Sequence, residues 1–343
     1  MLKIGIVGTG NIANMHMAGW KELKNAKVVL ACDVDAERAK KFAEQYAIPE
    51  FTGDALALFK RKDIDAVDIC TPNLQHYTLS LAAMKSGKHV LCEKPLAMNP
   101  AQIEEMIASS KKHKVKLTGI SNQRFCAEAQ AIKRFIDSGA AGRIYYAEAR
   151  WLRRRHLPGW NSGFLLKKLG GGPCLDIGVH ALDVAMYFMG NPRPVSVSGI
   201  SGNFIAKKGA LNLWGPYDKK IMDVEDFAGG FVRFDNGAAL SLSCSFMSNI
   251  KEKEENTIRL FGDKAGLCYP SAEYFTEKAG SLIDGEMTNL KAQAGHTVEI
   301  AKFADFITGK SKINPLPPEQ SLDAIKVLDG IHRSQRAGRE IRF

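Results

Sequence analysis

The chain has 343 residues, of which 45% are hydrophobic and 24% are charged, and its formal net charge is +10. This length predicts about two domains at roughly 100–200 residues each, and the composition is typical of a globular protein with a sizeable core. No run of Lys and Arg is longer than Arg153–Arg155, and basic residues are otherwise interleaved with acids. We therefore expect anionic small ligands, and no nucleic acid, as partners.

Cysteine usage and the apolar runs indicate the compartment. The seven cysteines form an odd set without Cys-x-x-Cys spacing, and several lie in strand-like apolar runs. This pattern is typical of buried, reduced thiols in a cytoplasmic protein. Met1-Leu2-Lys3 leads directly into a predicted strand, with no signal-peptide core and no apolar stretch long enough to span a membrane. We expect a cytoplasmic protein with no membrane partner.

The first 120 residues alternate between strand-like and helix-like segments. Predicted strands cover 3–7, 27–32, 65–70, 89–92 and 115–120, and predicted helices cover 11–24, 36–46, 75–86 and 100–113. Strands that alternate with helices predict a parallel sheet covered on both faces. Because such crossovers are right-handed, the fold class predicted for this domain, residues 1–122, is a doubly wound α/β sheet.

The pattern changes after Gly142. Longer strands are predicted at 144–151, 195–200, 226–234 and 238–246, and the last alternates Leu, Cys and Phe with serines. Asp235-Asn236-Gly237 predicts a hairpin between two of them. Residues 204–223 read as an irregular excursion, and a final helix is predicted at about 319–337. We expect residues 123–343 to form an α+β domain with a large, mainly antiparallel open sheet.

A glycine-rich turn follows the first predicted strand and opens the first helix. It reads Gly8-Thr9-Gly10-Asn11-Ile12-Ala13 and fits the dinucleotide pattern G-x-G-x-x-A. Gly8 permits the tight turn, and Gly10 lets a pyrophosphate approach the helix N-terminus. Asp33 closes the second strand, where its carboxylate can accept hydrogen bonds from ribose hydroxyls. The pattern favours a bound dinucleotide over a glycine turn without a ligand. Asp33 favours NAD as the cofactor, and Arg38 keeps NADP as the alternative.

Two further strand ends should line the cofactor crevice, because parallel sheets bind ligands at the carboxyl ends of their strands. Thr71-Pro72-Asn73 follows one strand, with His76 soon after, and Glu93-Lys94-Pro95 follows another. A free lysine has a pKa of roughly 10.4, which burial or a nearby cation lowers toward the range of a useful base. From position alone, Lys94 is equally well a surface lysine paired with Glu93.

The glycine turn at 170–172 leads into Asp176 and His180, which are four residues apart. In a helix this spacing places both side chains on one face, directed toward the turn. A metal site that includes Asp183 is the less favoured interpretation, because no further Cys or His cluster accompanies these residues; we expect no metal. The structural alternative is a capping aspartate and a core histidine.

A basic and aromatic stretch precedes this turn. Arg153-Arg154-Arg155-His156 and Trp160 lie between the first domain and the Asp176 helix. An aromatic face suits a sugar ring, and an arginine suits a carboxylate or phosphate substituent. A solvated basic loop, or a contact with a second subunit, is an equally good interpretation.

Together these motifs resemble the Gfo/Idh/MocA oxidoreductases, which include glucose-fructose oxidoreductase and inositol dehydrogenase. The motifs that carry the resemblance are Gly8-x-Gly10, Asp33, Thr71-Pro72-Asn73 with His76, Glu93-Lys94-Pro95, Gln123-Arg124-Phe125 and Asp176-x-x-x-His180. The resemblance implies a Rossmann domain, an α/β domain whose open sheet mediates oligomerisation, and NAD(P)-dependent chemistry on sugars or polyols. It also implies that Lys94, Asp176 and His180 are catalytic.

The predicted site follows from the motifs and the resemblance together. The cofactor is expected to contact Gly8, Thr9, Gly10, Asn11, Ile12, Asp33, Arg38, Thr71, Pro72, Asn73, His76, Glu93, Lys94 and Gln123. The substrate is expected to contact Lys94, Arg153, Trp160, Asp176 and His180. We also expect a homodimer or homotetramer, with the final helix packed back on the first domain.

The predicted function is a dehydrogenase that moves a hydride between nicotinamide and a secondary alcohol or ketone of a sugar, cyclitol or related polyol. One alternative is an NAD-dependent glycosidase that oxidises C3 transiently. A second alternative is a non-catalytic, dinucleotide-binding regulator, against which the intact Lys94, Asp176 and His180 argue.

Overall fold

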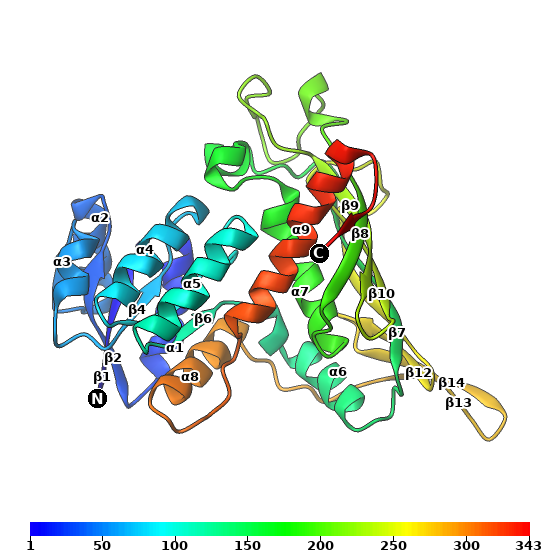
Figure 1. Cartoon of the computed structure of the whole chain (residues 1–343), viewed down its shortest axis with the longest axis horizontal. Helices are drawn as coiled ribbons and strands as arrows, with labels where there is room; N and C mark the ends of the chain where they lie inside the picture. The colour runs from blue at the N-terminus through cyan, green and yellow to red at the C-terminus, as the bar shows by residue number, and fades with distance from the viewer. The chain divides into compact units, whose positions relative to one another are not determined.

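A computed structural model describes residues 1–343 and divides them into two compact units (Figure 1). The first unit comprises residues 1–125 and 293–322, and the second comprises residues 126–292 and 323–343. The first boundary lies close to the one predicted at 122–123. The return of residues 293–322 to the first unit differs from the prediction, which assigned everything after 122 to one domain.

The first unit contains the predicted parallel sheet. Its six strands are β1 (Leu2–Val7), β2 (Ala26–Cys32), β3 (Glu50–Thr52), β4 (Ala66–Ile69), β5 (His89–Cys92) and β6 (Leu117–Gly119). They pair in the order β3-β2-β1-β4-β5-β6, and every pair is parallel. This order is that of a Rossmann sheet, so the predicted fold of this half is confirmed.

Helices join these strands. They are α1 (Asn11–Glu22), α2 (Ala36–Tyr46), α3 (Ala55–Lys60), α4 (Asn73–Lys85), α5 (Pro100–Lys112) and, after the second unit, α8 (Gly295–Ile307). Side-chain caps fix several starts: Asp35 accepts from the Arg38 amide at α2, and Asn99 accepts from the Gln102 amide at α5. The helix α8 was not predicted. It packs on α1, and its Phe303 meets Trp20 edge to face.

The second unit contains the predicted open sheet. Its nine strands are β7 (Ile144–Arg153), β8 (Pro194–Gly202), β9 (Phe227–Phe234), β10 (Ala239–Ser245), β11 (Glu254–Gly262), β12 (Ala265–Tyr269), β13 (Glu273–Lys278), β14 (Ser281–Glu286) and β15 (Ile341–Arg342). Their order is β14-β13-β12-β11-β7-β10-β9-β8-β15, and only β10 and β7 pair in parallel. The mainly antiparallel character is confirmed, and Asp235–Gly237 forms the predicted hairpin between β9 and β10.

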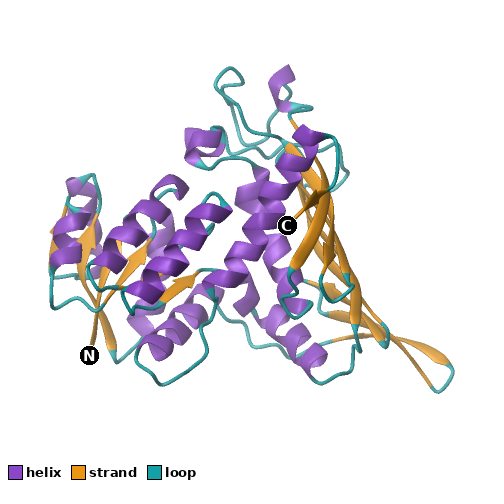
Figure 2. Cartoon of the chain, in the orientation of Figure 1, coloured by secondary structure: helices purple, strands orange, loops and turns teal.

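Helices cover one face of this sheet, as Figures 1 and 2 show. They are α6 (Ala127–Asp137), α7 (Val179–Phe188) and the part of α9 (Pro318–Ala337) that begins at residue 323. Along β10, Leu240, Leu242 and Cys244 are buried beneath them, as the period of two predicted. Ile331 of α9 lies against Gly199 and Gly230. Most of the final helix therefore packs on its own sheet, and its first residues, up to Leu322, belong to the first unit. The expected packing of this helix on the first domain stays a prediction.

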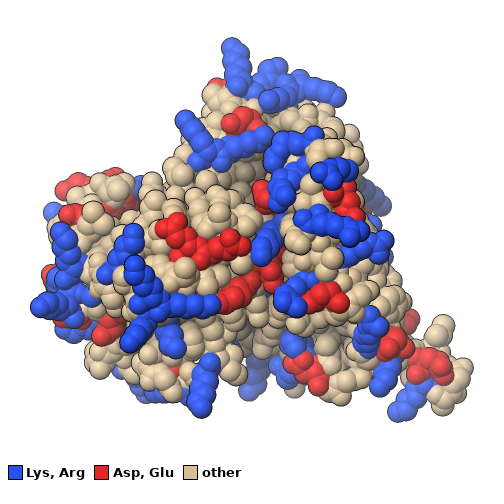
Figure 3. Space-filling view, in the orientation of Figure 1, with Lys and Arg blue, Asp and Glu red and all other residues tan.

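The charged residues and the cysteines are distributed over the fold in the following way. Lysine and arginine side chains are interspersed with acidic ones over the face in Figure 3. None of the seven cysteines is in a disulfide, and five of them are buried. The helices of this chain are all too short or too polar to cross a bilayer.

Candidate active site

The turn between β1 and α1 has the geometry of an anion site. Gly8 has φ +90°, and a Cβ there would lie 2.7 Å from the Cys70 backbone, so only glycine fits. Gly10 is the N-cap of α1, and no side chain caps that helix end. A Cβ on Gly10 would meet nothing within 4 Å. The N-terminus of α1 is therefore uncapped, with open space beside Gly10, and such a helix terminus favours a pyrophosphate.

Asp33 lies beside this turn at the end of β2, and its carboxylate is heavily hydrogen-bonded. Oδ2 accepts from the Thr9 amide at 2.9 Å and from the Thr9 hydroxyl at 3.0 Å. Arg38 donates through Nε to Oδ2 at 3.0 Å and through Nη2 to Oδ1 at 2.5 Å. Burial favours the neutral acid, but the bonds from Arg38 and Thr9 outweigh it and lower the pKa of Asp33 to about 2.

The saturation of Asp33 bears on the choice of cofactor. The Asp35 amide donates to Oδ1 as well, so five donors surround a carboxylate that has about four lone-pair sites. A ribose hydroxyl can therefore bond to Asp33 only if one donor leaves. Arg38 is the mobile donor, because its side chain is 51% exposed whereas Thr9 is buried. Released from Asp33, the same guanidinium suits a 2′-phosphate.

The ring of His76 contacts the segments that follow β4 and β5. Its Nδ1 lies 2.8 Å from the Pro95 carbonyl oxygen, and its Nε2 lies 2.7 Å from that of Thr71. Burial lowers the pKa of His76 and favours the neutral ring. The hydroxyl of Thr71 is buried with no hydrogen-bond partner in the chain. Such an unpaired buried group needs an explanation, and a bound cofactor supplies one.

A buried ionic network lies next to Lys94. His16 Nδ1 is 2.9 Å from Asp68 Oδ2, and its Nε2 is 2.9 Å from Glu93 Oε1. Trp20 Nε1 donates to Asp68 at 2.7 Å, and His296 Nε2 lies 3.4 Å from Glu93. The other Glu93 oxygen accepts from the Lys94 amide at 3.0 Å.

The charge of this network follows from its geometry. Desolvation opposes charge on His16, but the Asp68 carboxylate outweighs it and raises the pKa of His16 well above its usual 6.5. Desolvation likewise opposes charge on Glu93, while His16 and His296 hold the pKa of Glu93 well below its usual range. The structure thus contains an imidazolium between two carboxylates. Glu93 is engaged below the surface and fixes the Lys94 backbone, while its direct contact with a cofactor stays a prediction.

Asp176 and His180 lie at a transition between helix types in the second unit. Residues Cys174–Gly178 form one π-helical turn, and α7 continues from Val179. Gly172 precedes it with φ +99°, and a Cβ there would lie 2.6 Å from Glu225 Oε1. The same carboxylate oxygen accepts from the Cys174 amide at 3.2 Å. The prediction assumed a regular helix at this point, whereas a π turn widens the backbone there, as at many functional sites.

Strand β7 supplies the surroundings of both side chains. Arg153 Nη1 lies 4.0 Å from Asp176 Oδ2, and the ring centroids of Trp151 and His180 are 5.6 Å apart. Glu254 of β11 accepts from Arg153 Nε at 2.8 Å and from Trp151 Nε1 at 2.6 Å. Glu254 and Trp151 were missed from the sequence. Glu254 and Trp151 come together through the pairing of β7 with β11, which a single sequence does not reveal.

The other predicted residues are distributed over both units. Asn73 begins α4, and Gln123 lies in a short 3₁₀ turn of the first unit, Asn122–Phe125. Lys94 belongs to the first unit, whereas Asp176 and His180 belong to the second. Trp160 is 65% exposed, and its ring centroid lies 5.3 Å from that of Trp214.

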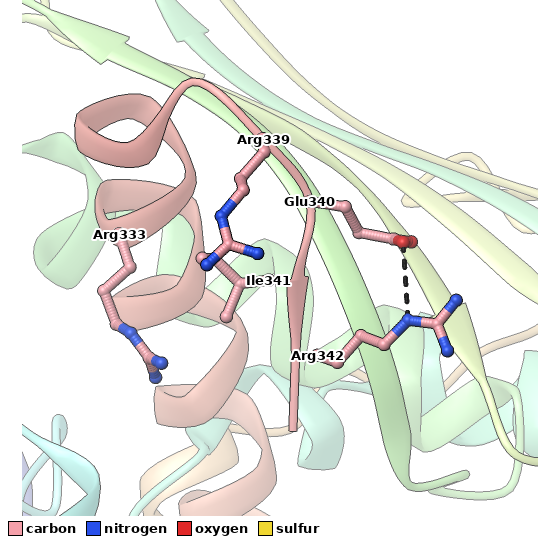
Figure 4. Close-up of a pocket in the computed structure, with 5 residues that line it drawn as sticks. All are labelled: Arg333, Arg339, Glu340, Ile341 and Arg342. Atoms are coloured by element: carbon pink, nitrogen blue, oxygen red, sulfur yellow. Dashed lines mark ion pairs between the residues drawn. The ribbon is translucent and has the colours of Figure 1, made fainter.

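One surface hollow in the second unit lies apart from these residues. Arg333, Arg339, Glu340, Ile341 and Arg342 line it (Figure 4). The Arg342–Glu340 ion pair, at 3.8 Å, crosses one side of it. None of the predicted cofactor or substrate residues lines this hollow, so it takes no part in the candidate site.

Comparison with known families agrees with this arrangement. Residues 2–120 match the model of an oxidoreductase family with an NAD-binding Rossmann fold, and residues 129–268 match the GFO/IDH/MocA C-terminal domain. The chain is 34% identical to D-glucoside 3-dehydrogenase of Escherichia coli over 311 residues, which are 90% of this chain and 88% of that protein. It is 30% identical to myo-inositol 2-dehydrogenase of Thermotoga maritima over 189 residues, or 55% of each chain.

Solved structures share the fold over the whole chain. A structure of levoglucosan dehydrogenase with NADH and levoglucosan superposes with a TM-score of 0.83 at 21% identity, covering 99% of both chains. An oxidoreductase domain protein from Kribbella flavida gives 0.85 at 22% identity, covering 99% of this chain and 98% of that one.

The buried network predicts a pH-dependent loss of stability in His16→Ala. Removing the imidazolium leaves two buried carboxylates without their cation, which typically costs about 3–5 kcal/mol. Because the folded-state pKa of His16 is raised, its contribution is full below pH 6.5 and is lost as pH rises through the raised value. Urea unfolding of both proteins at pH 6, 8 and 10 should show the widest gap at pH 6.

The matched control for this experiment is Met15→Ala, which truncates an exposed side chain of the same helix. It should unfold close to wild type at every pH. A His16→Ala gap that is independent of pH would contradict the imidazolium assignment.

The Asp33–Arg38 pair predicts how cofactor preference responds to Arg38→Ala. The wild type should bind NADH more tightly than NADPH. Removing the guanidinium frees acceptor sites on Asp33 and removes the cation nearest to a 2′-phosphate. We expect NADH affinity to hold and NADPH affinity to fall roughly tenfold, as measured by fluorescence titration. Lys40→Ala controls for net charge on α2. If Arg38→Ala weakened NADH more than NADPH, the assigned role would be wrong.

Proposed function

Since this chain belongs to the Gfo/Idh/MocA family of oxidoreductases, we propose that it oxidises a secondary alcohol of a sugar, cyclitol or related polyol, or reduces the ketone in reverse. The observation that carries the proposal is the setting of Asp176 and His180, which lie beside a guanidinium and an indole. A proton acceptor next to an aromatic face and a fixed cation suits a ring that carries hydroxyl groups.

The proposed chemistry divides proton transfer between two residues. Bound nicotinamide supplies the hydride acceptor. His180 is the proposed acceptor for the hydroxyl proton, because an imidazole can take up and release a proton near neutral pH. The Lys94 ammonium would hydrogen-bond the same oxygen and ease loss of that proton, and Asp176 would orient the imidazole or accept from a neighbouring hydroxyl. The Glu93 carboxylate holds the Lys94 amide in place for this task.

A D-glucoside oxidised at C3 is the first substrate to test. The similarity to D-glucoside 3-dehydrogenase over nine-tenths of the chain supports this choice. The partial similarity to myo-inositol 2-dehydrogenase keeps cyclitols in the panel. A panel of glucosides, free sugars and cyclitols, followed at 340 nm, should show net NADH formation with at least one member. Cleavage of a glycosidic bond without net NADH would instead support a glycosidase that uses transient oxidation.

The proposed roles predict large rate losses in Lys94→Ala and His180→Ala. General acid–base groups contribute about 10²–10⁴-fold, so each variant should lower kcat by at least 100-fold at pH 7. NADH affinity, measured by fluorescence titration, should stay close to wild type. A variant with near-normal kcat would lose its assigned role, and a collapse of NADH affinity would place the residue in the cofactor site instead.

We also infer a homo-oligomer that forms through the uncovered face of the nine-stranded sheet. Ser241 and Ser243 point to this face, as the sequence predicted. The ring of Tyr146 lies 5.5 Å from that of Phe261 and 6.4 Å from that of Phe231, and Phe231 is 39% exposed. These three rings form an aromatic cluster that burial against a second copy would stabilise.

This proposal predicts dissociation by Phe231→Glu. A carboxylate placed in a buried symmetric contact appears in both copies and is strongly unfavourable. Light scattering at micromolar concentration should give a dimer or tetramer for wild type and a lower mass for the variant. Leu56→Glu, an exposed position in α3 of the first unit, is the control. A monomeric wild type would remove the proposal.

A further inference from the structure

Three aromatic side chains form a strip in the second unit, and its two tryptophans are exposed. The ring centroids of Trp160 and Trp214 are 5.3 Å apart, and those of Trp160 and Phe164 are 6.4 Å apart. Trp160 is 65% exposed and Trp214 is 41% exposed. We call Trp214, Trp160 and Phe164 the aromatic strip. Leaving two indoles in contact with water is unfavourable, and clustered exposed aromatics commonly mark a binding surface.

The strip is held by hydrogen bonds on both of its segments. Asn212 Nδ2 donates to the Leu157 carbonyl at 2.8 Å, and the Leu157 amide donates to Asn212 Oδ1 at 2.9 Å. The Leu213 amide donates to the Arg155 carbonyl at 2.7 Å. These bonds link the segment just before Trp160 to the segment that carries Trp214. The two indoles are therefore pre-organised, which reduces the entropy lost when a ligand binds.

The far end of the excursion is also anchored. Asp226 is fully buried, and its carboxylate accepts from three successive amides, those of Phe204, Ile205 and Ala206, at 3.0, 2.7 and 2.6 Å. Tyr217 donates its hydroxyl proton to the Ala206 carbonyl at 2.6 Å. The excursion that the sequence presented as irregular is therefore fixed at both ends of the segment that bears Trp214.

The strip is continuous with Asp176 through a single side chain. The Arg153 guanidinium carbon lies 4.9 Å from the Trp214 ring centroid, and Arg153 Nη1 lies 4.0 Å from Asp176. Arg153 itself is fixed by Glu254, and its side chain is only 14% exposed. Arg153 therefore contacts both Asp176 and Trp214, and Trp214 in turn neighbours Trp160.

We propose that the aromatic strip is a subsite for a second six-membered ring, joined by a glycosidic bond to the ring that reacts at Asp176 and His180. This inference rests on the proposed function. It specifies that the substrates are glycosides and not free monosaccharides. The apolar C–H face of a pyranose, or the face of an aryl group, packs on an indole, while ring hydroxyls stay in water. The glycosidic oxygen would lie beside Arg153, whose guanidinium donates hydrogen bonds and accepts none.

The test compares three substrates that share one reacting ring: methyl β-glucoside, phenyl β-glucoside and cellobiose. NADH formation gives kcat and KM for each with wild type, Trp160→Ala, Trp214→Ala and Leu211→Ala. Leu211 is an exposed residue of the same excursion outside the strip, so it is the matched control. Isothermal titration of the same ligands with the NADH-bound proteins provides a readout that does not depend on turnover.

We expect wild type to favour a two-ring substrate over methyl glucoside. Trp160→Ala should raise KM and Kd for the two-ring ligands roughly three- to tenfold more than it raises them for methyl glucoside, and Leu211→Ala should leave all of these constants close to wild type. A loss confined to phenyl glucoside assigns the subsite to aryl groups, and a loss confined to cellobiose assigns it to sugars.

Two effects of Trp160→Ala would overturn the subsite. One is an equal effect of Trp160→Ala on all three substrates. The other is a fall in oligomer mass on light scattering, which would show that the strip contacts a second copy. If no glycoside, free sugar or cyclitol gave NADH, the proposed function would fail first. If wild type oxidised methyl glucoside as well as the two-ring substrates, the subsite alone would fail.

Discussion

The imidazolium of His16, buried between Asp68 and Glu93, is the interaction on which the first unit depends most. It joins α1, β4 and the loop after β5 through three side chains with almost no exposure. Each charged group there is tolerated only because the others are present. The same set fixes the Lys94 amide, so the position of this half-buried residue is determined by groups in the core.

In the second unit, backbone conformation and a carboxylate on a neighbouring strand together position the proposed substrate residues. Gly172 brings the chain close to Glu225, and one π turn follows before α7 begins. Glu254 reaches across from β11 and holds Arg153 and Trp151 on the neighbouring strand. In both units, therefore, a carboxylate orients a residue that is proposed to act on the substrate, Glu93 for Lys94 and Glu254 for Arg153.

Local sequence patterns were enough to predict the Rossmann sheet, the glycine loop and the β9–β10 hairpin, because each depends on residues that are neighbours in the chain. Asp68, Glu93 and His296 contact one another only after folding, so His16 looked like any helix residue. The strands β13 and β14 are largely exposed and carry little alternation. Trp214 lies in an excursion whose order comes from Asp226 and Asn212, and no local pattern signals that order.

The proposed reaction is direct hydride transfer from a ring carbon of the substrate to nicotinamide, and isotopic labelling distinguishes this route from the others. A glucoside carrying deuterium at C3 would be turned over with NAD, and the reduced cofactor would be isolated and analysed by NMR. Direct transfer should place deuterium at C4 of the nicotinamide, in one stereochemical position, together with a 3-keto product. Deuterium lost to water, or a cleaved glycoside without net reduced cofactor, would contradict it.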